Sequence, residues 1–210
     1  MTDAIAASDT SRHDLLKVAA AGIVTGLLTP LLPPLIDKLG GTPGDFRIAL
    51  VAVPFAVLVF VLVRRGSANP GWAALTAAMV TMIAFVCAVH AAILIDAQAD
   101  GLSKMPRNIL AGLTGGFVGT AIMALGVALL PASPRSFMAW LPMLISGTVT
   151  GALLALDSAL GLDLTSVLYP AWQACVAVAW RRRYAHDGPA RPGPSHSRIK
   201  RPAAPDREIR

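Results

Sequence analysis

Few residues of this chain could do chemistry, and the clearest candidates are ionisable groups in or beside long apolar stretches. His90 is the only histidine inside such a stretch, and Asp157 lies at the end of another. Ionisable groups within a membrane span are costly and are therefore candidates for substrate binding or proton transfer. For His90 the alternative is an imidazole that is hydrogen-bonded near the membrane surface, where a single histidine is easily satisfied.

Carboxylates are concentrated in one set of predicted loops and helix ends. They could attract cations or cationic substrates to an opening on that side. The alternative is that acidic residues are tolerated there while basic residues are retained on the other side. Asp96 and Asp100 are spaced like one half of a Mg²⁺-binding carboxylate motif, but no second half follows, so the sequence assigns no metal. The residues concerned are Asp37, Asp45, Asp96, Asp100, Asp157 and Asp163.

Hydroxyl, amide and proline residues add polar character to the apolar stretches that contain them. Pro170 leaves a backbone carbonyl without its helical donor, and neighbouring groups must satisfy that carbonyl. Thr25, Thr150 and Gln173 could do so or could line a hydrophilic path, although hydroxyls in membrane helices more often bond their own helix. The predicted polar path consists of His90, Asp157, Thr25, Thr150, Gln173 and Pro170.

Glycines recur three and four residues apart in several stretches, a spacing that lets helix backbones approach closely in a membrane. The sequence therefore predicts that these glycines pack helices together, either within one subunit or between copies of the chain. A phosphate-binding loop is excluded, because no strand precedes them and no Lys-Ser/Thr pair follows. The glycines are Gly22, Gly26, Gly112, Gly115, Gly116, Gly119, Gly147 and Gly151.

The sequence carries no catalytic, cofactor or metal signature. No nucleophile and base are spaced as in a known catalytic motif. Cys87 and Cys175 lie at different expected depths, which favours two buried thiols that behave as small hydrophobic side chains. We therefore predict no catalytic residue, cofactor or metal site, and an enzyme, for example one that modifies lipids, is the least favoured interpretation.

Long apolar stretches dominate the chain. Of its 210 residues 55% are hydrophobic and only 14% are charged, compared with about 25% charged in soluble domains. A bilayer core needs about 20 apolar residues per helix, and a soluble bundle would need a polar face on each helix. The sequence predicts an all-α, polytopic membrane helix bundle. Its six expected transmembrane helices are 15–36, 46–63, 72–95, 109–130, 137–156 and 162–180.

The two ends of the chain differ from this transmembrane domain, residues 15–180. Residues 1–14 are polar and predict a disordered cytoplasmic N-terminus. Residues 181–210 are basic, Pro-rich and nearly free of apolar side chains, which predicts a disordered cytoplasmic tail. Anionic lipid headgroups are the expected partner of this tail, at about 1 kcal/mol per basic residue. Nucleic acid is not expected, since no aromatic residue after Tyr184 could stack on a base.

Charge asymmetry sets the expected orientation. With six spans, both termini share one side of the membrane. Placing them in the cytoplasm puts 14 of the 18 Lys and Arg residues inside, as the positive-inside rule requires. Without the tail the preference is weaker, because the outer loops hold four basic residues. Trp72, Trp140 and Trp180 fall at predicted inner ends, where indole rings prefer the interface.

A faint internal repeat relates the two ends of the predicted domain. Gly22-Ile23-Val24-Thr25-Gly26 matches Gly147-Thr148-Val149-Thr150-Gly151, and each is followed by a proline-containing helix that ends in arginines. Parallel repeats of this kind occur in transporters. Gly, Val and Thr are also common in any membrane helix, so a chance match stays open.

These features favour transport in the inner (plasma) membrane, by a small carrier, a channel or a membrane subunit of a transport complex. The proline-broken polar helices, the repeat and the close glycine packing support this hypothesis. The alternative is a non-catalytic accessory or assembly protein that binds a partner through its glycine faces and its basic tail. A homo-oligomer or a membrane partner protein is compatible with both hypotheses.

Overall fold

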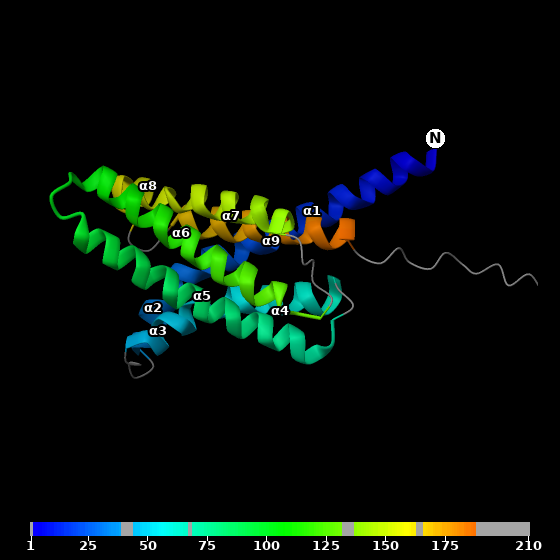
Figure 1. The fold of residues 1–210 in the computed structure, drawn as a ribbon, viewed down its shortest axis with the longest axis horizontal. Helices are drawn as coiled ribbons and strands as arrows, with labels where there is room; N and C mark the ends of the chain where they lie inside the picture. Colours follow the sequence, from blue (N-terminus) through cyan, green and yellow to red (C-terminus); the bar gives the residue numbers. More distant parts are fainter. Residues whose placement is uncertain (1, 39–43, 67–68, 132–136, 163–165, 188–210) are drawn as a thin grey trace, which may run out of the picture.

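The structure, a computed structural model, describes residues 2–38, 44–66, 69–131, 137–162 and 166–187. Every regular element within these residues is a helix or a helical turn (Figure 1), which confirms the predicted all-α class for this part of the chain. In order they are α1 (Thr2–Leu28), the 3₁₀ turn η1 (Thr29–Leu31), α2 (Leu32–Lys38), α3 (Gly44–Val51), α4 (Val53–Gly66), α5 (Gly71–Gln98), α6 (Lys104–Ala128), α7 (Phe137–Gly151), α8 (Leu153–Leu160) and α9 (Leu168–Asp187).

Several helices are long and apolar enough to cross a bilayer. By length and composition the described residues provide four such spans, Arg12–Lys38, Gly71–Gln98, Lys104–Ala128 and Trp140–Leu160. Helices α3 and α4, bent by 52° between them, make a fifth if the pair counts as one span. The sixth expected span, 162–180, is not in this set, because α9 begins only at Leu168 and reaches a basic run at Arg181.

Both ends of the described chain are helical where the sequence predicts irregular structure. Helix α1 begins at Thr2, so residues 2–14 are helical and lead into the first candidate span, which begins at Arg12. This segment contains several alanines, the strongest helix formers. At the other end α9 extends through Arg181 to Asp187. The predicted tail from residue 188 onward lies outside the described residues.

Prolines decide where several helices break. Pro30 lies in the turn η1, which separates α1 from α2. The residues after this turn are helical as α2, because Pro33 and Pro34 fall in its first turn, where no backbone N–H is needed. Pro54 lies directly after the bend between α3 and α4. Because proline has no backbone N–H, it cannot continue the hydrogen bonds of the preceding helix.

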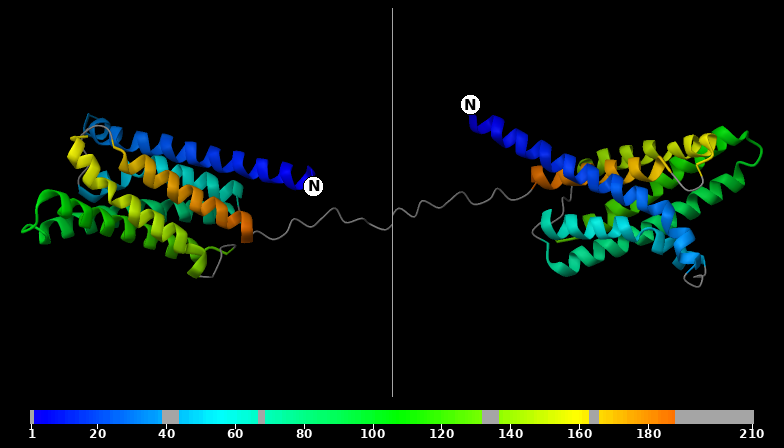
Figure 2. Two further views of the ribbon diagram at one scale, coloured as in Figure 1. Left: turned by 90° about the horizontal axis from the view of Figure 1, so that it is seen from above. Right: turned by 180° about the vertical axis from the view of Figure 1, so that it is seen from behind.

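The helices form one bundle whose neighbours are set by short connections (Figure 2). Helices α5 and α6 form a hairpin, α6 packs against α7 and α8, and α9 packs mainly against α1 and α7. Helices α1 and α9 run antiparallel. The Nη2 atom of Arg181 on α9 lies 3.4 Å from the carboxylate of Asp14 on α1, so the two ends of the described chain lie at the same end of the bundle.

Helices α6 and α7 cross at glycines on both sides. A Cβ atom added to Gly112 would meet the backbone of Gly151, and one added to Gly116 would meet the backbone of Gly147. Only glycine permits this approach, which in lipid replaces the missing hydrophobic driving force between helices.

The same helix approaches α5 through a second pair of glycines. A Cβ atom on Gly115 would lie 2.9 Å from the carbonyl oxygen of Ala88, and one on Gly119 would lie 3.1 Å from the Cβ of Ala88. Helix α6 is therefore held closely by α5 on one side and by α7 on the other, and the three helices form a fixed unit.

Large apolar side chains cover the outer faces of α1 and α5. A soluble monomer rarely exposes contiguous apolar patches of more than a few hundred Å², whereas a helix that faces lipid presents such side chains along its length. The protein is thus a multi-pass membrane protein whose outer surface suits a lipid bilayer. Examples of these exposed side chains are Ile23, Val24, Leu27, Leu75, Met79 and Ile83.

Tryptophans occupy the end of the bundle at which the described chain begins and ends. Trp140 and Trp180 are buried and pack edge to face, with ring centroids 6.3 Å apart. The sequence predicts that these two indole rings lie at the membrane interface. They are instead buried between α7 and α9, because burial removes more of their apolar surface from water. Trp72 is exposed, as an interfacial indole requires.

Candidate functional site

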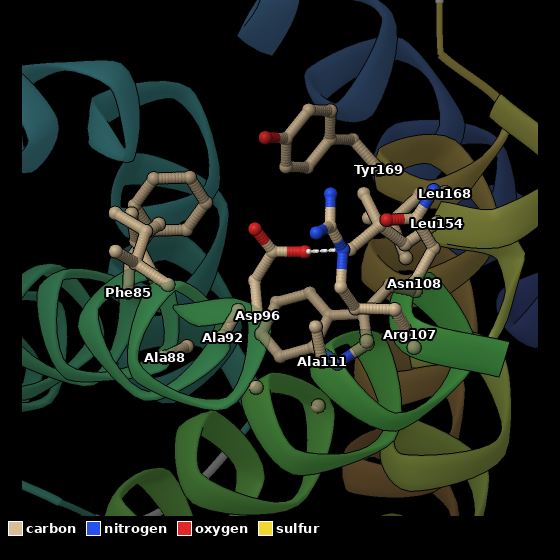
Figure 3. Close-up of a pocket in the computed structure, with 17 residues that line it drawn as sticks. Phe85, Ala88, Ala92, Asp96, Arg107, Asn108, Ala111, Leu154, Leu168 and Tyr169 are labelled. Atoms are coloured by element: carbon tan, nitrogen blue, oxygen red, sulfur yellow. Dashed lines mark ion pairs between the residues drawn. The ribbon is translucent and has the colours of Figure 1, made fainter. Parts of the chain in front are cut away.

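A cavity of about 440 Å³ lies at the opposite end of the bundle, between the α5–α6 hairpin and helices α8 and α9. It forms because α9 packs on α1 and α7 and stands away from α5 and α6. Small residues widen the gap, among them Ala88 and Ala92 of α5 and Ala111 of α6. The wall is mainly apolar, with a few polar groups near one end (Figure 3).

An ion pair marks the polar end of this cavity. Arg107 Nε lies 2.8 Å from Asp96 Oδ1, but this nitrogen makes no hydrogen bond within the described residues, so the contact is electrostatic and poorly aligned. Arg107 Nη1 donates a hydrogen bond of 2.9 Å to Asp100 Oδ1. The side chains of Arg107 and Asp96 are 27% and 44% exposed, so water reaches the pair.

Aromatic side chains form another part of the cavity wall. The ring centroids of Phe85 on α5 and Tyr169 on α9 lie 6.0 Å apart, so these rings bridge the two sides of the gap. Trp172, one helical turn further along α9, also lines the cavity and packs edge-on against Phe55. Its Nε1–H is buried without a hydrogen-bond partner in the described part of the chain.

Helix α9 is fixed from the other side by a close contact with α1. A Cβ atom on Gly22 would lie 2.6 Å from the Cα of Ala174, and one on Gly26 would meet the backbone of Pro170. Pro170 therefore lies directly against a glycine of α1. Because neither backbone can move closer, this contact sets the distance at which Tyr169 faces α5.

A buried polar bond joins α9 to the turn η1, which directly follows α1. Gln173 Nε2 donates a hydrogen bond of 2.9 Å to Thr29 Oγ1, and both side chains are buried. Thr29 in turn donates to the carbonyl of Thr25. The other amide atom of Gln173, Oε1, is buried without a partner in the described residues.

Asp157 holds the start of α9. Its carboxylate accepts hydrogen bonds from the backbone N–H groups of Val167 and Leu168 at 2.8 and 3.3 Å, and from the hydroxyl of Ser166. Ser166 Oγ also accepts a bond from the N–H of Tyr169. Helix N-termini leave such N–H groups unpaired. A negative charge at this place is also stabilised by the positive end of the helix dipole. Asp157 therefore positions the cavity wall without lining the cavity.

His90 lies away from the cavity. It is exposed on α5, where its Nδ1 lies 2.9 Å from the carbonyl oxygen of Val86 and its Nε2 lies 3.1 Å from Asp45 Oδ1 on α3. It therefore connects the bent pair α3–α4 to α5. Near it Arg47 pairs with Asp37 at 2.6 Å.

The hydroxyls of Thr25 and Thr150 bond their own helices. Thr25 donates to the carbonyls of Ala21 and Gly22, and Thr150 donates to those of Ser146 and Gly147. The two threonines thus occupy equivalent places in the matching segments of α1 and α7. Each satisfies its hydroxyl without a partner from another helix.

The structure distributes the predicted polar-path residues over separate places. Asp157 caps α9, His90 pairs with Asp45, Gln173 and Pro170 lie in the α1–α9 contact, and none of the six lines the cavity. The sequence does not mark Arg107 or Phe85 as site residues. For Arg107 the sequence does contain a signal, the short turn between α5 and α6, because residues that flank such a turn lie close together.

A second hollow, of about 610 Å³, lies between α1, α7 and α9 toward the tryptophan end. It is lined by Pro142, Ser146 and Cys175, with Arg182 as its charged residue. Its polar groups do not converge on an ion pair or an aromatic wall. The cavity at the α5–α6 turn is therefore the stronger candidate site.

No group of three or more His, Cys, Asp or Glu residues in the described part of the chain is placed to hold a metal ion. The chain matches no known protein family, and no significant similarity to a curated protein or a solved structure is found. The class that the fold defines is a polytopic, all-helical membrane protein.

Proposed function

We propose that this membrane protein is a small carrier that binds an amphipathic organic substrate in the cavity between α5, α6, α8 and α9. The observation that carries the proposal is the cavity itself. Ligand sites typically measure about 300–1,000 Å³ and combine an apolar wall with a few convergent polar groups. The cavity has about 440 Å³ and one ion pair, Asp96–Arg107, near its polar end.

Interrupted helices beside the cavity support a transport role. Helix α7 contains Pro142 and ends at Gly151, which lines the cavity, and α8 begins two residues later. Interrupted membrane helices near a binding site are typical of transporters, in which one part of the bundle moves against another. Here α9, together with the helix α1 on which it packs, would move against the glycine-packed hairpin of α5 and α6.

Flux in proteoliposomes tests this proposal. The purified chain is reconstituted and challenged with a panel of fluorescent amphipathic cations, anions and neutral compounds. We expect at least one class to cross faster than in protein-free liposomes. Val89→Trp, which fills the cavity, should then abolish the flux, whereas Ile83→Trp on the exposed face of the same helix should not. Equal flux in both variants would exclude the cavity as the transport site.

We further propose six crossings with both termini in the cytoplasm and the protein in the inner (plasma) membrane. The contact between Asp14 and Arg181 supports placing both ends of the described chain on one side of the membrane. Basic residues such as Arg64 and Arg65 at the end of α4 support assigning that side to the cytoplasm, as the positive-inside rule requires. On this side the basic residues after Trp180 would meet anionic headgroups. Fluorescent-protein fusions at each terminus should report cytoplasmic ends, and a periplasmic reporter active at the C-terminus would contradict the orientation.

A further inference from the structure

We infer that the cavity is selective for a hydrophobic organic cation and that Asp96 is the counter-ion of this ligand. The inference rests on the proposed function and names its substrate class. It depends on the balance of charge at the cavity, on the aromatic wall and on the geometry of the Asp96–Arg107 pair.

The charges at the polar end favour a cation. Arg107 is the one basic residue among the described residues that line the cavity, and it already contacts two carboxylates, those of Asp96 and Asp100. The three groups together carry one negative charge. An anion would have to displace a carboxylate from Arg107 while meeting the repulsion of the other, whereas a cation completes the neutralisation of the cluster.

The aromatic wall favours a ligand with a large apolar part. Phe85, Tyr169 and Trp172 come from two helices and border the same space. Phe85 and Asp96 lie three helical turns apart on α5, about 16 Å along the helix axis, so the rings and the carboxylate would contact different parts of the ligand. The same rings provide apolar surface for the organic part of the ligand.

The geometry of the ion pair allows an exchange of partners. Arg107 is hydrogen-bonded to Asp100 through Nη1, but its Nε makes no hydrogen bond to Asp96 despite the 2.8 Å separation. Well-aligned charged hydrogen bonds are the stronger ones. When a cation enters, Arg107 can therefore stay on Asp100 while the Asp96 carboxylate turns to the ligand, and no buried charge is left without a partner.

Two ions of the same shape and opposite charge test the inference. Tetraphenylphosphonium and tetraphenylborate are titrated into the full chain in lipid nanodiscs, with empty nanodiscs as the background. We expect saturable binding of the phosphonium and only background partition of the borate. Saturable binding of the borate at equal or higher affinity, or no saturable binding of the phosphonium, would overturn the inference.

Variants assign the charge to its residue. Asp96→Asn should weaken phosphonium binding by about tenfold or more, since it removes the opposite charge of a partly buried pair. Asp37→Asn removes the acid of another ion pair, Asp37–Arg47, that lies outside the cavity and should change binding by less than about twofold. Unchanged affinity in a monodisperse Asp96→Asn protein would contradict the role of Asp96.

A second pair of variants keeps the test independent of charge. Tyr169→Leu should weaken phosphonium binding several-fold, and Tyr169→Phe should retain it, because phenylalanine keeps the aromatic ring that packs against the phenyl groups of the ligand. Equal affinity of the two variants would contradict the aromatic contribution. Phosphonium binding without any flux would leave the cation site in place and refute the carrier, whereas selective flux of anions would refute the cation site and retain the carrier.

Discussion

Helix α9 has two sides that are built on different principles. Toward α1 it packs backbone against backbone: Gly22 and Gly26 admit Ala174 and Pro170 so closely that a Cβ atom would not fit, and Gln173 bonds Thr29. Toward α5 it leaves about 440 Å³ of space, crossed by the contact of the Tyr169 and Phe85 rings. One side has no room for a methyl group, and the other has room for a ligand.

A small membrane bundle can thus keep a cavity open when the helix that forms its wall, here α9, is packed tightly against another helix on its opposite side. Lipid is as apolar as a leucine side chain, so no hydrophobic drive closes a gap between helices. A helix held on one side by glycine contacts and at its start by the Asp157 carboxylate need not collapse onto its other neighbour. Substitutions on the α1-facing side of α9 should therefore cost more stability than substitutions on its cavity-facing side.

The largest effect is expected from a side chain placed in the α1–α9 contact. Gly26→Leu would force the helices apart, because its Cβ atom alone meets the backbone of Pro170. Overpacking of a site whose neighbour is backbone should cost about 3 kcal/mol or more. We expect loss of the monodisperse protein on size-exclusion chromatography in detergent.

The matched control makes the same substitution where there is space. A Cβ atom on Gly101, in the turn after α5, meets nothing within 4 Å, and its backbone is not left-handed. Gly101→Leu should therefore leave the elution profile and the thermal midpoint unchanged. If Gly26→Leu behaves like Gly101→Leu, α1 and α9 do not pack as described.

A smaller loss is expected from the cap of α9. Asp157→Ala leaves the N–H groups of Val167 and Leu168 without their acceptor, and the loss of an N-terminal cap typically costs about 1 kcal/mol. The thermal midpoint in detergent should fall accordingly. Asp37→Ala, which breaks an exposed ion pair, should change it less, since such pairs contribute about 0–1 kcal/mol. Equal effects of the two variants would refute the capping role.

The sequence indicates the tight side of α9 better than the open one, for a physical reason. Glycines spaced four apart on α1 mark a face where backbones approach, and this signal is local. The Asp96–Arg107 pair depends on the turn that folds α6 back on α5, and the cap by Asp157 depends on the chain returning at Val167. Such pairings join separate helices, and hydropathy within one helix does not encode them.

The number of crossings shows a related limit. Apolar length along 15–36, 72–95 and 109–130 corresponds to helices that are long enough to span a bilayer. For 162–180 the apolar run includes the residues before Leu168, where α9 begins. Helix starts depend on capping groups, here Ser166 and Asp157, and hydropathy alone does not locate them.

A double-mutant cycle measures the buried polar bond on the tight side. Thr29→Val and Gln173→Leu each remove one partner of the buried bond. Side-chain hydrogen bonds between membrane helices average about 0.6 kcal/mol in such cycles, and Gln173 already has an unpaired Oε1, so we expect a coupling of this small size. It would be measured by reversible unfolding in mixed micelles. A coupling of zero would mean that the two side chains act separately.

The smallest effect is expected on the open side, and it tests whether that side is open. Val89→Ile adds one methylene at the cavity wall, where it enters space, so the unfolding free energy should change by less than about 0.5 kcal/mol. Val176→Ile adds the same group to the buried core of α9, where Val176 is fully buried, and overpacking there should cost about 1–3 kcal/mol. Similar costs at both positions would mean that the gap between α5 and α9 is as closely packed as the α9 core, and neither a carrier site nor a cation site could then lie there.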